Sequence, residues 1–230
     1  MRMRVHWVQL ATQVAGMFAV LGAALFVAAG TVAWAAGWAY LILFFGFVVA
    51  LSRWLLRANP GLLNERLTGF GAEGQKTWDK VWYALINVVF LGWLVLMPLD
   101  AVRFRWSRMP GAAHGLGALL LMASFYGFYL TFRENSYLSP AVRIQPERGQ
   151  RVVSTGPYRW VRHPMYALAI VFFAGTTLLL GSWYGLLGGA GLVVGVAGRA
   201  VAEERTLAEG LPGYREYMKR VRYRLIPYVW

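Results

Sequence analysis

The chain of 230 residues contains no cysteine, only three histidines and only ten acidic residues. The absence of cysteine excludes disulfides, zinc sites built on thiolates, iron–sulfur clusters and a cysteine nucleophile. His6, His114 and His163 lie far apart in the sequence, so a site with three histidine ligands is not expected. The sequence therefore predicts no bound metal.

Charged residues are also scarce, at 14% of the chain against roughly 25% in an ordinary soluble domain. Hydrophobic residues make up 58% and the mean hydropathy is +0.47, which excludes a soluble globular protein. The apolar residues form blocks near the ~20 residues that cross a hydrocarbon core. We therefore predict an all-α integral membrane protein with about six transmembrane helices, at residues 8–34, 38–56, 81–99, 115–132, 164–180 and 183–198.

The lysines and arginines lie mostly on one side of these spans. Two precede the first span, five lie from Arg53 to the third, six lie between the fourth and fifth, and seven follow the sixth, which sums to 20 of 23. The other side has three, at positions 103, 105 and 108. The positive-inside rule then places both termini in the cytoplasm. Twenty arginines to three lysines indicate a bacterial source, so we predict a multi-pass protein of the cell inner membrane.

The net charge of +13 would suggest nucleic acid in a soluble protein. Here the basic residues flank apolar helices, where anionic lipid headgroups and orientation signals account for them. We therefore expect membrane lipids as partners and no nucleic acid.

The last two spans are joined by only two residues, 181–182, and must be antiparallel neighbours. Each arm of this hairpin measures 17 residue steps, so at a rise of roughly 1.5 Å per residue both open ends return to the same depth. The sequence therefore predicts one polar cluster at the open end of the hairpin: Arg162, His163, Arg199, Glu203 and Glu204.

The start of the fifth span favours an anionic ligand. Pro164 fits the first position of a helix, where its missing N–H costs nothing. The free N–H groups and the positive dipole end of that helix, with Arg162 and His163 beside them, suit a carboxylate or phosphate. The alternative is that these side chains only anchor the helix at the membrane interface.

Glu203 and Glu204 lie on the C-terminal side of the sixth span, where the helix dipole disfavours carboxylates. Arg199 before Glu203 is also the less favourable order for an ion pair four residues apart. Such broken local rules often mark a site, and paired carboxylates suit an ammonium, a sulfonium or ribose hydroxyls. The alternative is a solvated helix surface.

The segment from 214 to 222 has the pattern of a short basic amphipathic helix. Tyr214, Tyr217, Met218 and Val221 fall at i, i+3, i+4 and i+7, with basic residues between them. Such a helix is predicted to lie on the inner membrane surface, and alternatively to cap a pocket with its tyrosines.

Together these residues resemble the isoprenylcysteine carboxyl methyltransferase family and the wider membrane methyltransferases that include phospholipid N-methyltransferases. The resemblance covers residues 135–227, including Asn135 and 142–153. Three motifs carry it in the correct order: Gly156-Pro157-Tyr158-Arg159-x-x-Arg162-His163-Pro164-x-Tyr166, then Arg199-x-x-x-Glu203-Glu204-x-x-Leu207, then Tyr214-x-x-Tyr217 followed by Pro227.

The apolar blocks predict one membrane domain, 1–230, with N-terminal transmembrane helices in 1–133, and the resemblance implies that 134–230 is the cofactor-binding and catalytic region. It implies that S-adenosylmethionine binds at the cytoplasmic side and that a lipophilic acceptor enters from the bilayer. Arg199 and Glu204 match the catalytic pair. The implied cofactor-binding residues are Val153, Gly156, Tyr158, Arg162, His163, Pro164, Tyr166, Glu203, Glu204 and Tyr214.

Two other function classes remain open from the sequence. Sterol reductases resemble the same region, and an NADPH-dependent membrane reductase would use Arg148, Arg151, Arg159 and Arg162 for the 2′-phosphate. A transporter or sensor is less well supported, because no charge lies in the middle of a span. The acceptor is also open between an isoprenylcysteine-like carboxylate, a phospholipid amine, a quinone-like isoprenoid and a small hydrophobic carboxylate or thiol.

Overall fold

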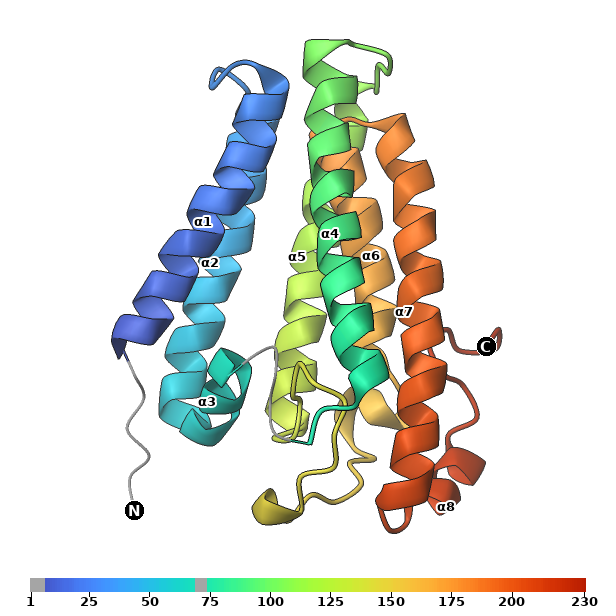
Figure 1. Cartoon of the computed structure of the whole chain (residues 1–230). Helices are drawn as coiled ribbons and strands as arrows, with labels where there is room; N and C mark the ends of the chain where they lie inside the picture. Colours follow the sequence, from blue (N-terminus) through green and yellow to red (C-terminus); the bar gives the residue numbers. More distant parts are fainter. Residues whose placement is uncertain (1–6, 69–73) are drawn as a thin grey trace.

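The computed structural model describes residues 7–68 and 74–230, and this part of the chain is built from helices without strands (Figure 1). Arg2, Arg4 and His6 lie outside the described residues. The elements are α1 (Trp7–Ala29), α2 (Ala35–Ala58), α3 (Pro60–Thr68), α4 (Thr77–Pro98), the π-helical turn η1 (Leu99–Arg103), α5 (Gly111–Glu134), the short turns η2 (Pro146–Arg148) and η3 (Gly156–Arg159), α6 (Pro164–Leu180), α7 (Trp183–Gly210) and α8 (Tyr214–Arg220).

Five helical segments of the described part are long and apolar enough to cross a membrane: α1, α2, α4 with η1, α5 and α7. α6 is a shorter apolar helix of 17 residues, about 26 Å long at 1.5 Å per residue. The prediction of an all-α membrane protein is confirmed, with α6 as the shortest of the six expected helices.

The helices lie side by side in two groups (Figure 1). α1 and α2 form one hairpin, and α4 to α7 form a bundle beside it. α3, α8 and the loop between α5 and α6 all lie at the same end of the molecule, which we call the site end. Phenylalanines join the two groups, since the rings of Phe47 on α2 and Phe125 on α5 stack with centroids 4.6 Å apart.

Glycines bring α5 and α6 into close contact. A Cβ atom at Gly117 would lie 2.2 Å from the backbone nitrogen of Leu179, and one at Gly175 would lie 2.9 Å from that of Leu121. Close backbone approach of this kind is a common way for helices to associate in membranes. It fixes the position of α6 against α5.

The predicted hairpin is present as α6 and α7. Gly181 ends α6 with a φ of +81° and donates its N–H to the Thr177 carbonyl at 2.9 Å, as glycine commonly does after a helix. Ser182 caps α7 by accepting from the Gly185 amide at 2.8 Å, and its hydroxyl donates to buried Asp100 at 2.6 Å. α7 continues to Gly210, 12 residues past the predicted end of the span. The motif Arg199-x-x-x-Glu203-Glu204-x-x-Leu207 is therefore helical throughout.

Candidate active site

A cavity of about 270 Å³ lies at the site end, between the loop 135–163, the start of α6, the second half of α7 and α8. Tyr83 of α4 and Arg66 of α3 complete its wall. The structure brings nine of the eleven residues predicted for the site to this cavity: Val153, Tyr158, Arg162, His163, Pro164, Tyr166, Arg199, Glu203 and Tyr214.

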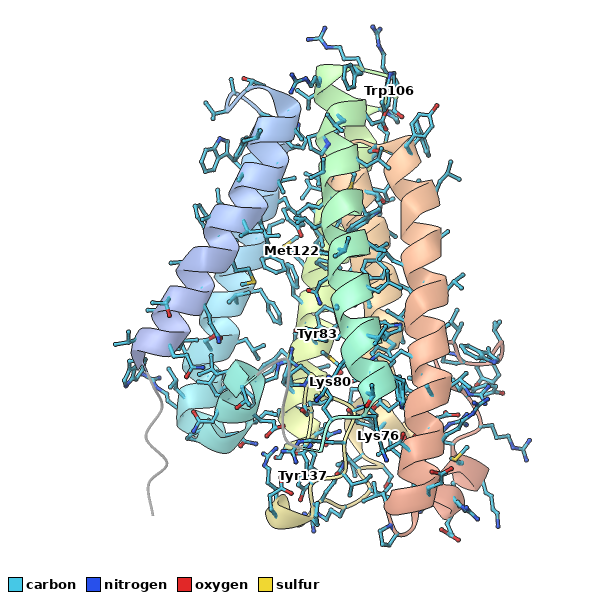
Figure 2. All side chains as sticks on the ribbon, in the orientation of Figure 1. Lys76, Lys80, Tyr83, Trp106, Met122 and Tyr137 are labelled. Atoms are coloured by element: carbon cyan, nitrogen blue, oxygen red, sulfur yellow. The ribbon has the colours of Figure 1, made fainter. Side chains whose placement is uncertain are left out.

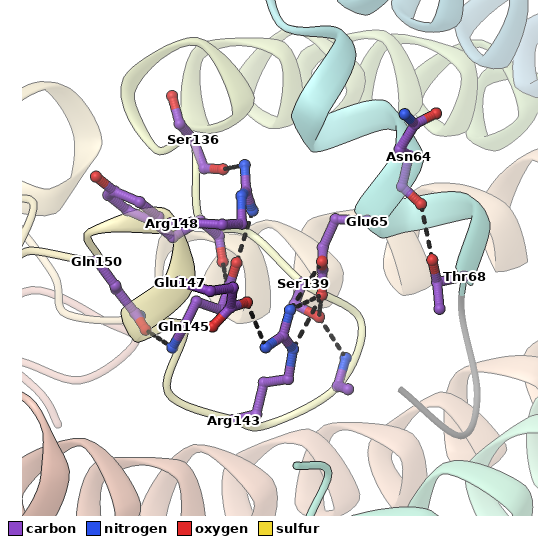
Figure 3. Close-up of polar contacts among 12 residues, drawn as sticks. Asn64, Glu65, Thr68, Ser136, Ser139, Arg143, Gln145, Glu147, Arg148 and Gln150 are labelled. Atoms are coloured by element: carbon purple, nitrogen blue, oxygen red, sulfur yellow. Dashed lines mark hydrogen bonds and ion pairs between the residues drawn. The ribbon is translucent and has the colours of Figure 1, made fainter. Parts of the chain in front are cut away.

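The loop that covers the cavity is held in place by ion pairs and by its own hydrogen bonds (Figure 3). Arg143 lies 2.9 Å from Glu65 of α3 and 2.7 Å from Glu147, and Arg148 donates to the Ser136 carbonyl at 2.7 Å. Burial raises the pKa of Glu65, but hydrogen bonds from Arg143 and Ser139 outweigh it and hold this pKa below its ordinary value. The loop is therefore tied to α3.

Glu204 lies at the centre of a buried cluster of basic groups. Its Oε1 accepts from Arg162 Nε at 2.5 Å and lies 3.3 Å from His163 Nε2, and its Oε2 accepts from Arg224 Nε at 2.7 Å. The side chain of Glu204 is only 4% exposed. Both oxygens of this carboxylate therefore contact basic side chains. The geometry of the hairpin predicted two of these neighbours, Arg162 and His163, but not Arg224.

The C-terminal tail closes this cluster from the far side. The backbone amides of Arg162 and His163 donate to carbonyls of the tail segment 221–224 at 2.9 Å. Two further carbonyls of the same segment accept from Arg162 Nη1 at 2.7 Å. The motif before α6 is therefore held by the tail as well as by α7, an arrangement that the sequence did not predict.

Arg199 pairs with Asp79 of α4, which sequence reasoning missed. Arg199 Nε donates to Asp79 Oδ1 at 3.0 Å, and its Nη2 donates to the Pro140 carbonyl at 2.6 Å. The guanidinium lies 4.6 Å from the ring centroid of Trp82 and 5.8 Å from that of Tyr166. Arg199 and Glu204 thus have separate partners and form no direct pair.

Asp79 is fully buried and accepts two more hydrogen bonds, from the Gln75 side chain and the Val142 amide, both at 2.8 Å. It joins α4, α7 and the loop 135–163 at one point. The signal in the sequence is weak, because an acidic residue in the first turn of a helix is common on dipole grounds alone. The predicted start of this helix, at 81, lies four residues after its observed start at Thr77.

Glu203 faces the cavity with one oxygen available. Its Oε2 accepts from the Tyr166 hydroxyl at 2.6 Å, while no described residue donates to its Oε1. The ring of Tyr166 in turn stacks on His163, with centroids 5.6 Å apart. Glu203 can therefore accept a hydrogen bond from a ligand or lie beside a positive charge.

Three tyrosines form the opposite wall. Asn135 donates to the Tyr158 hydroxyl at 2.8 Å, and the Tyr217 hydroxyl donates to the Tyr158 carbonyl at 2.7 Å. The buried hydroxyl of Tyr214 has no hydrogen-bond partner among the described residues. Burial raises the pKa of all three phenols above the ordinary value, so they remain protonated and able to donate.

The predicted amphipathic helix is present as α8. Its tyrosines, Tyr214 and Tyr217, are buried and line the cavity, while Arg215, Lys219 and Arg220 are exposed. α8 therefore caps the pocket, which was the alternative interpretation of this segment. Contact of its basic face with the membrane surface stays a prediction.

Gly156 and Glu204 are the two predicted site residues that do not line the cavity. Gly156 has a φ of +55°, and a Cβ there would lie 2.3 Å from Cγ of Glu134. It is therefore needed for the turn and for its close packing on α5. Glu204 lies behind Arg162 and His163, so it reaches the cavity only through them.

The four arginines considered for a nucleotide 2′-phosphate do not gather at one point. Only Arg151 and Arg162 line the cavity, and Arg162 is bound to Glu204. Arg148 bonds within its own loop, and Arg159 lies 5.0 Å from the ring centroid of Trp160.

Residues 112–211, from α5 to the end of α7, match the profile of the phospholipid methyltransferase family. This segment is similar to phospholipid methyltransferase domains. The family is related to the isoprenylcysteine carboxyl methyltransferases, so the resemblance found in the sequence is confirmed. The domain contains every predicted site residue except Tyr214.

No curated protein sequence gives a significant match to the chain. The match and the apolar helices together support a membrane methyltransferase.

Proposed function

We propose that the protein transfers a methyl group from S-adenosylmethionine to a lipophilic acceptor, and that its site end faces the cytoplasm at the cell inner membrane. The observation that carries the proposal is the cavity itself. Residues of the matched segment and of α8 that lie far apart in the sequence line this one cavity, and two of them, Glu203 and Tyr214, carry an oxygen without a partner among the described residues.

The residues present suit this cofactor. The buried Tyr214 hydroxyl and the free oxygen of Glu203 are unused among the described residues, and such groups are costly to bury unless a ligand satisfies them. Glu203 would receive the ammonium or the ribose hydroxyls. His163, at the positive end of α6, would receive the carboxylate. When bound, S-adenosylmethionine supplies a methyl group on a sulfonium, whose carbon–sulfur bond breaks with its electron pair left on sulfur as the acceptor atom bonds the methyl carbon.

The protein then has to position the reactants and exclude water. Arg199 lines the cavity and is held rigidly by Asp79, Pro140 and two aromatic rings, so it can orient an acceptor group at the methyl carbon. Glu204 does not line the cavity. We assign it as a positioning residue that fixes Arg162 and His163, while Arg199 is the catalytic residue.

The experiment is methyl transfer by the full chain purified in detergent. Incubation with S-adenosylmethionine labelled in the methyl group and an extract of bacterial membrane lipids should transfer label into the organic phase. Loss of transfer in boiled protein is the control. Consumption of NADPH by the same sample without any transfer of label would contradict the proposal and favour a reductase.

A further inference from the structure

A second cavity of about 440 Å³ lies between the α1–α2 hairpin and the bundle, and its lining is mainly apolar. Phenylalanines from four helices dominate its wall, with Phe47 from α2, Phe90 from α4, Phe128 from α5 and Phe172 from α6 among them. Unlike the first cavity, it is enclosed largely by the half of the chain that lies outside the methyltransferase domain.

The two cavities meet at the site end. Arg66 of α3 and Met165 in the first turn of α6 line both of them. Met165 follows directly after His163 and Pro164, which line the polar cavity. A molecule with a polar end and an apolar chain can therefore occupy both cavities at once, with the junction of its two parts beside Arg66.

Arg66 is a charged group that has no counter-ion among the described residues at this junction. The side chain is partly buried, and its guanidinium lies 5.0 Å from the ring centroid of Phe132. No carboxylate of the described residues lies within ion-pairing distance of it. Burial, with a smaller contribution from the like charge of Arg199, lowers the pKa of this guanidinium. A cation held in such surroundings needs an anion to offset the cost of desolvation.

The other arginines that line the first cavity are either paired with a carboxylate or exposed. Arg143 pairs with Glu65, Arg162 with Glu204 and Arg199 with Asp79. Arg151 is exposed and can be solvated by water. Arg66 is thus the one partly buried arginine that lines this cavity and lacks a carboxylate among the described residues.

We propose that Arg66 is the specificity-determining residue for the acceptor, and that it selects an amphiphilic lipid with a negatively charged headgroup whose chain lies in the apolar cavity. This inference rests on the proposed function, because a headgroup bound by Arg66 lies at the wall of the cavity that we assign to the cofactor, near Arg199. The charge it recognises is that of a carboxylate or a phosphate. Arg66 lies outside the matched domain, so this selection belongs to the N-terminal half of the chain.

The test is binding of three radiolabelled probes that share one chain and differ in headgroup: hexadecanoate, hexadecyl phosphate and hexadecanol. Each is equilibrated with the full chain in detergent micelles. The wild type should bind at least one anionic probe about tenfold to a hundredfold more tightly than the alcohol, as one charged hydrogen-bonded contact predicts. Preference between the two anions then identifies the headgroup chemistry.

Arg66→Gln should bring the affinities for all three probes within about threefold of one another, while Arg66→Lys should keep part of the preference. The matched control is Arg57→Gln, because Arg57 is exposed at the end of α2 and lines neither cavity. Equal binding of the three probes by the wild type, or the same loss of preference in both glutamine variants, would overturn the proposal.

The apolar half is tested by Val48→Trp, which should weaken binding of all three probes. Val49→Trp is its control, because Val49 is 56% exposed and does not line the cavity. An equal effect of the two tryptophans would also overturn the proposal. Titration of each variant with S-adenosylmethionine keeps the two claims apart. Absence of cofactor binding by the wild type would count against the proposed function, whereas cofactor binding by a wild type that binds the three probes equally would count against the role of Arg66 alone.

Discussion

Glu204 uses two oxygens to hold Arg162, His163 and Arg224, and removing its charge would leave two arginines near the cavity without a carboxylate. Such a residue shapes the cofactor site without contacting the cofactor. The distinction between positioning and catalysis can be measured, because it divides the effect of a substitution between KM and kcat.

Glu204→Gln should raise KM for S-adenosylmethionine by about tenfold or more, as the loss of charged hydrogen bonds predicts, with a much smaller change in kcat. Glu204→Asp should restore part of the affinity. Glu209→Gln, at an exposed position of the same helix, serves as the control. A fall in kcat with an unchanged KM would instead place Glu204 at the reacting atoms.

Arg199→Lys should lower kcat about a hundredfold, because lysine keeps the charge beside Asp79 but cannot reproduce the fork of donors or the stacking on Trp82. Cofactor affinity measured by calorimetry should stay within about threefold of the wild type. Arg205→Lys makes the same exchange at an exposed position six residues further along α7. Full activity of Arg199→Lys would remove Arg199 from the catalytic role.

The pairing of Arg199 with Asp79 shows what one sequence cannot supply. The two residues lie 120 positions apart, and neither has a local pattern that names the other. By contrast, the proximity of Glu204 to Arg162 and His163 could be predicted. A two-residue connection forces antiparallel neighbours, and equal arm lengths then fix the depth of both ends.

At the scale of elements, local rules located the boundaries of α6 and the start of α7, whereas the predicted end of the first span at 34 was wrong because α1 ends at Ala29, before Gly30. Pro164 marked the start of α6 and Gly181 its end, so this helix was predicted to the residue. α3 was missed because it is short and begins with the breakers Pro60 and Gly61. The length of α7 was underestimated because its second half is polar and follows the end of the apolar block. That half is stabilised by packing against the loop 135–163 and not by contact with lipid.

The contact of α3 with the loop 135–163 carries the next prediction. Glu65→Gln should lower the free energy of unfolding at neutral pH by about 1–2 kcal/mol, since it breaks a largely buried ion pair with Arg143. The folded pKa of Glu65 lies below its ordinary value of 4.5. Its stabilisation is therefore present above that value and is lost as the pH falls through the folded pKa.

Thermal unfolding in detergent at several pH values tests this sign. The difference in Tm between wild type and Glu65→Gln should be largest near neutral pH and should close under acid conditions. Glu216→Gln, at an exposed position of α8, should show no such difference. A gap that widens as the pH falls would contradict the assignment of Glu65 as a charged partner of Arg143.

At the scale of the whole molecule, the absence of cysteine makes orientation directly measurable. Arg108→Cys and Glu216→Cys place single thiols at exposed positions on opposite ends of the bundle. In intact cells a membrane-impermeant maleimide should label the first, and it should label the second only after permeabilisation. The reverse pattern would place the site end outside the cytoplasm and contradict the proposed orientation.

The positions of single groups seen in Figure 2 fit a division of the molecule by depth. Lys76, Lys80 and Tyr137 lie at the site end, Met122 lies among the apolar helices, and Trp106 lies at the opposite end. Composition alone predicted this layout, because charge and apolar length are bulk properties of each segment. The cavity that joins the two halves depends on packing between distant segments and had to be observed.

The central claim is that the cavity between the loop 135–163, α6, α7 and α8 binds S-adenosylmethionine, and calorimetric titration of the full chain in detergent tests it most directly. S-adenosylmethionine and S-adenosylhomocysteine should each bind at one site. Tyr214→Phe should weaken both by about threefold to tenfold through loss of one hydrogen bond, and Tyr228→Phe, at an exposed position, should not. Binding of NADPH alone, or of none of these ligands by well-folded protein, would contradict the account.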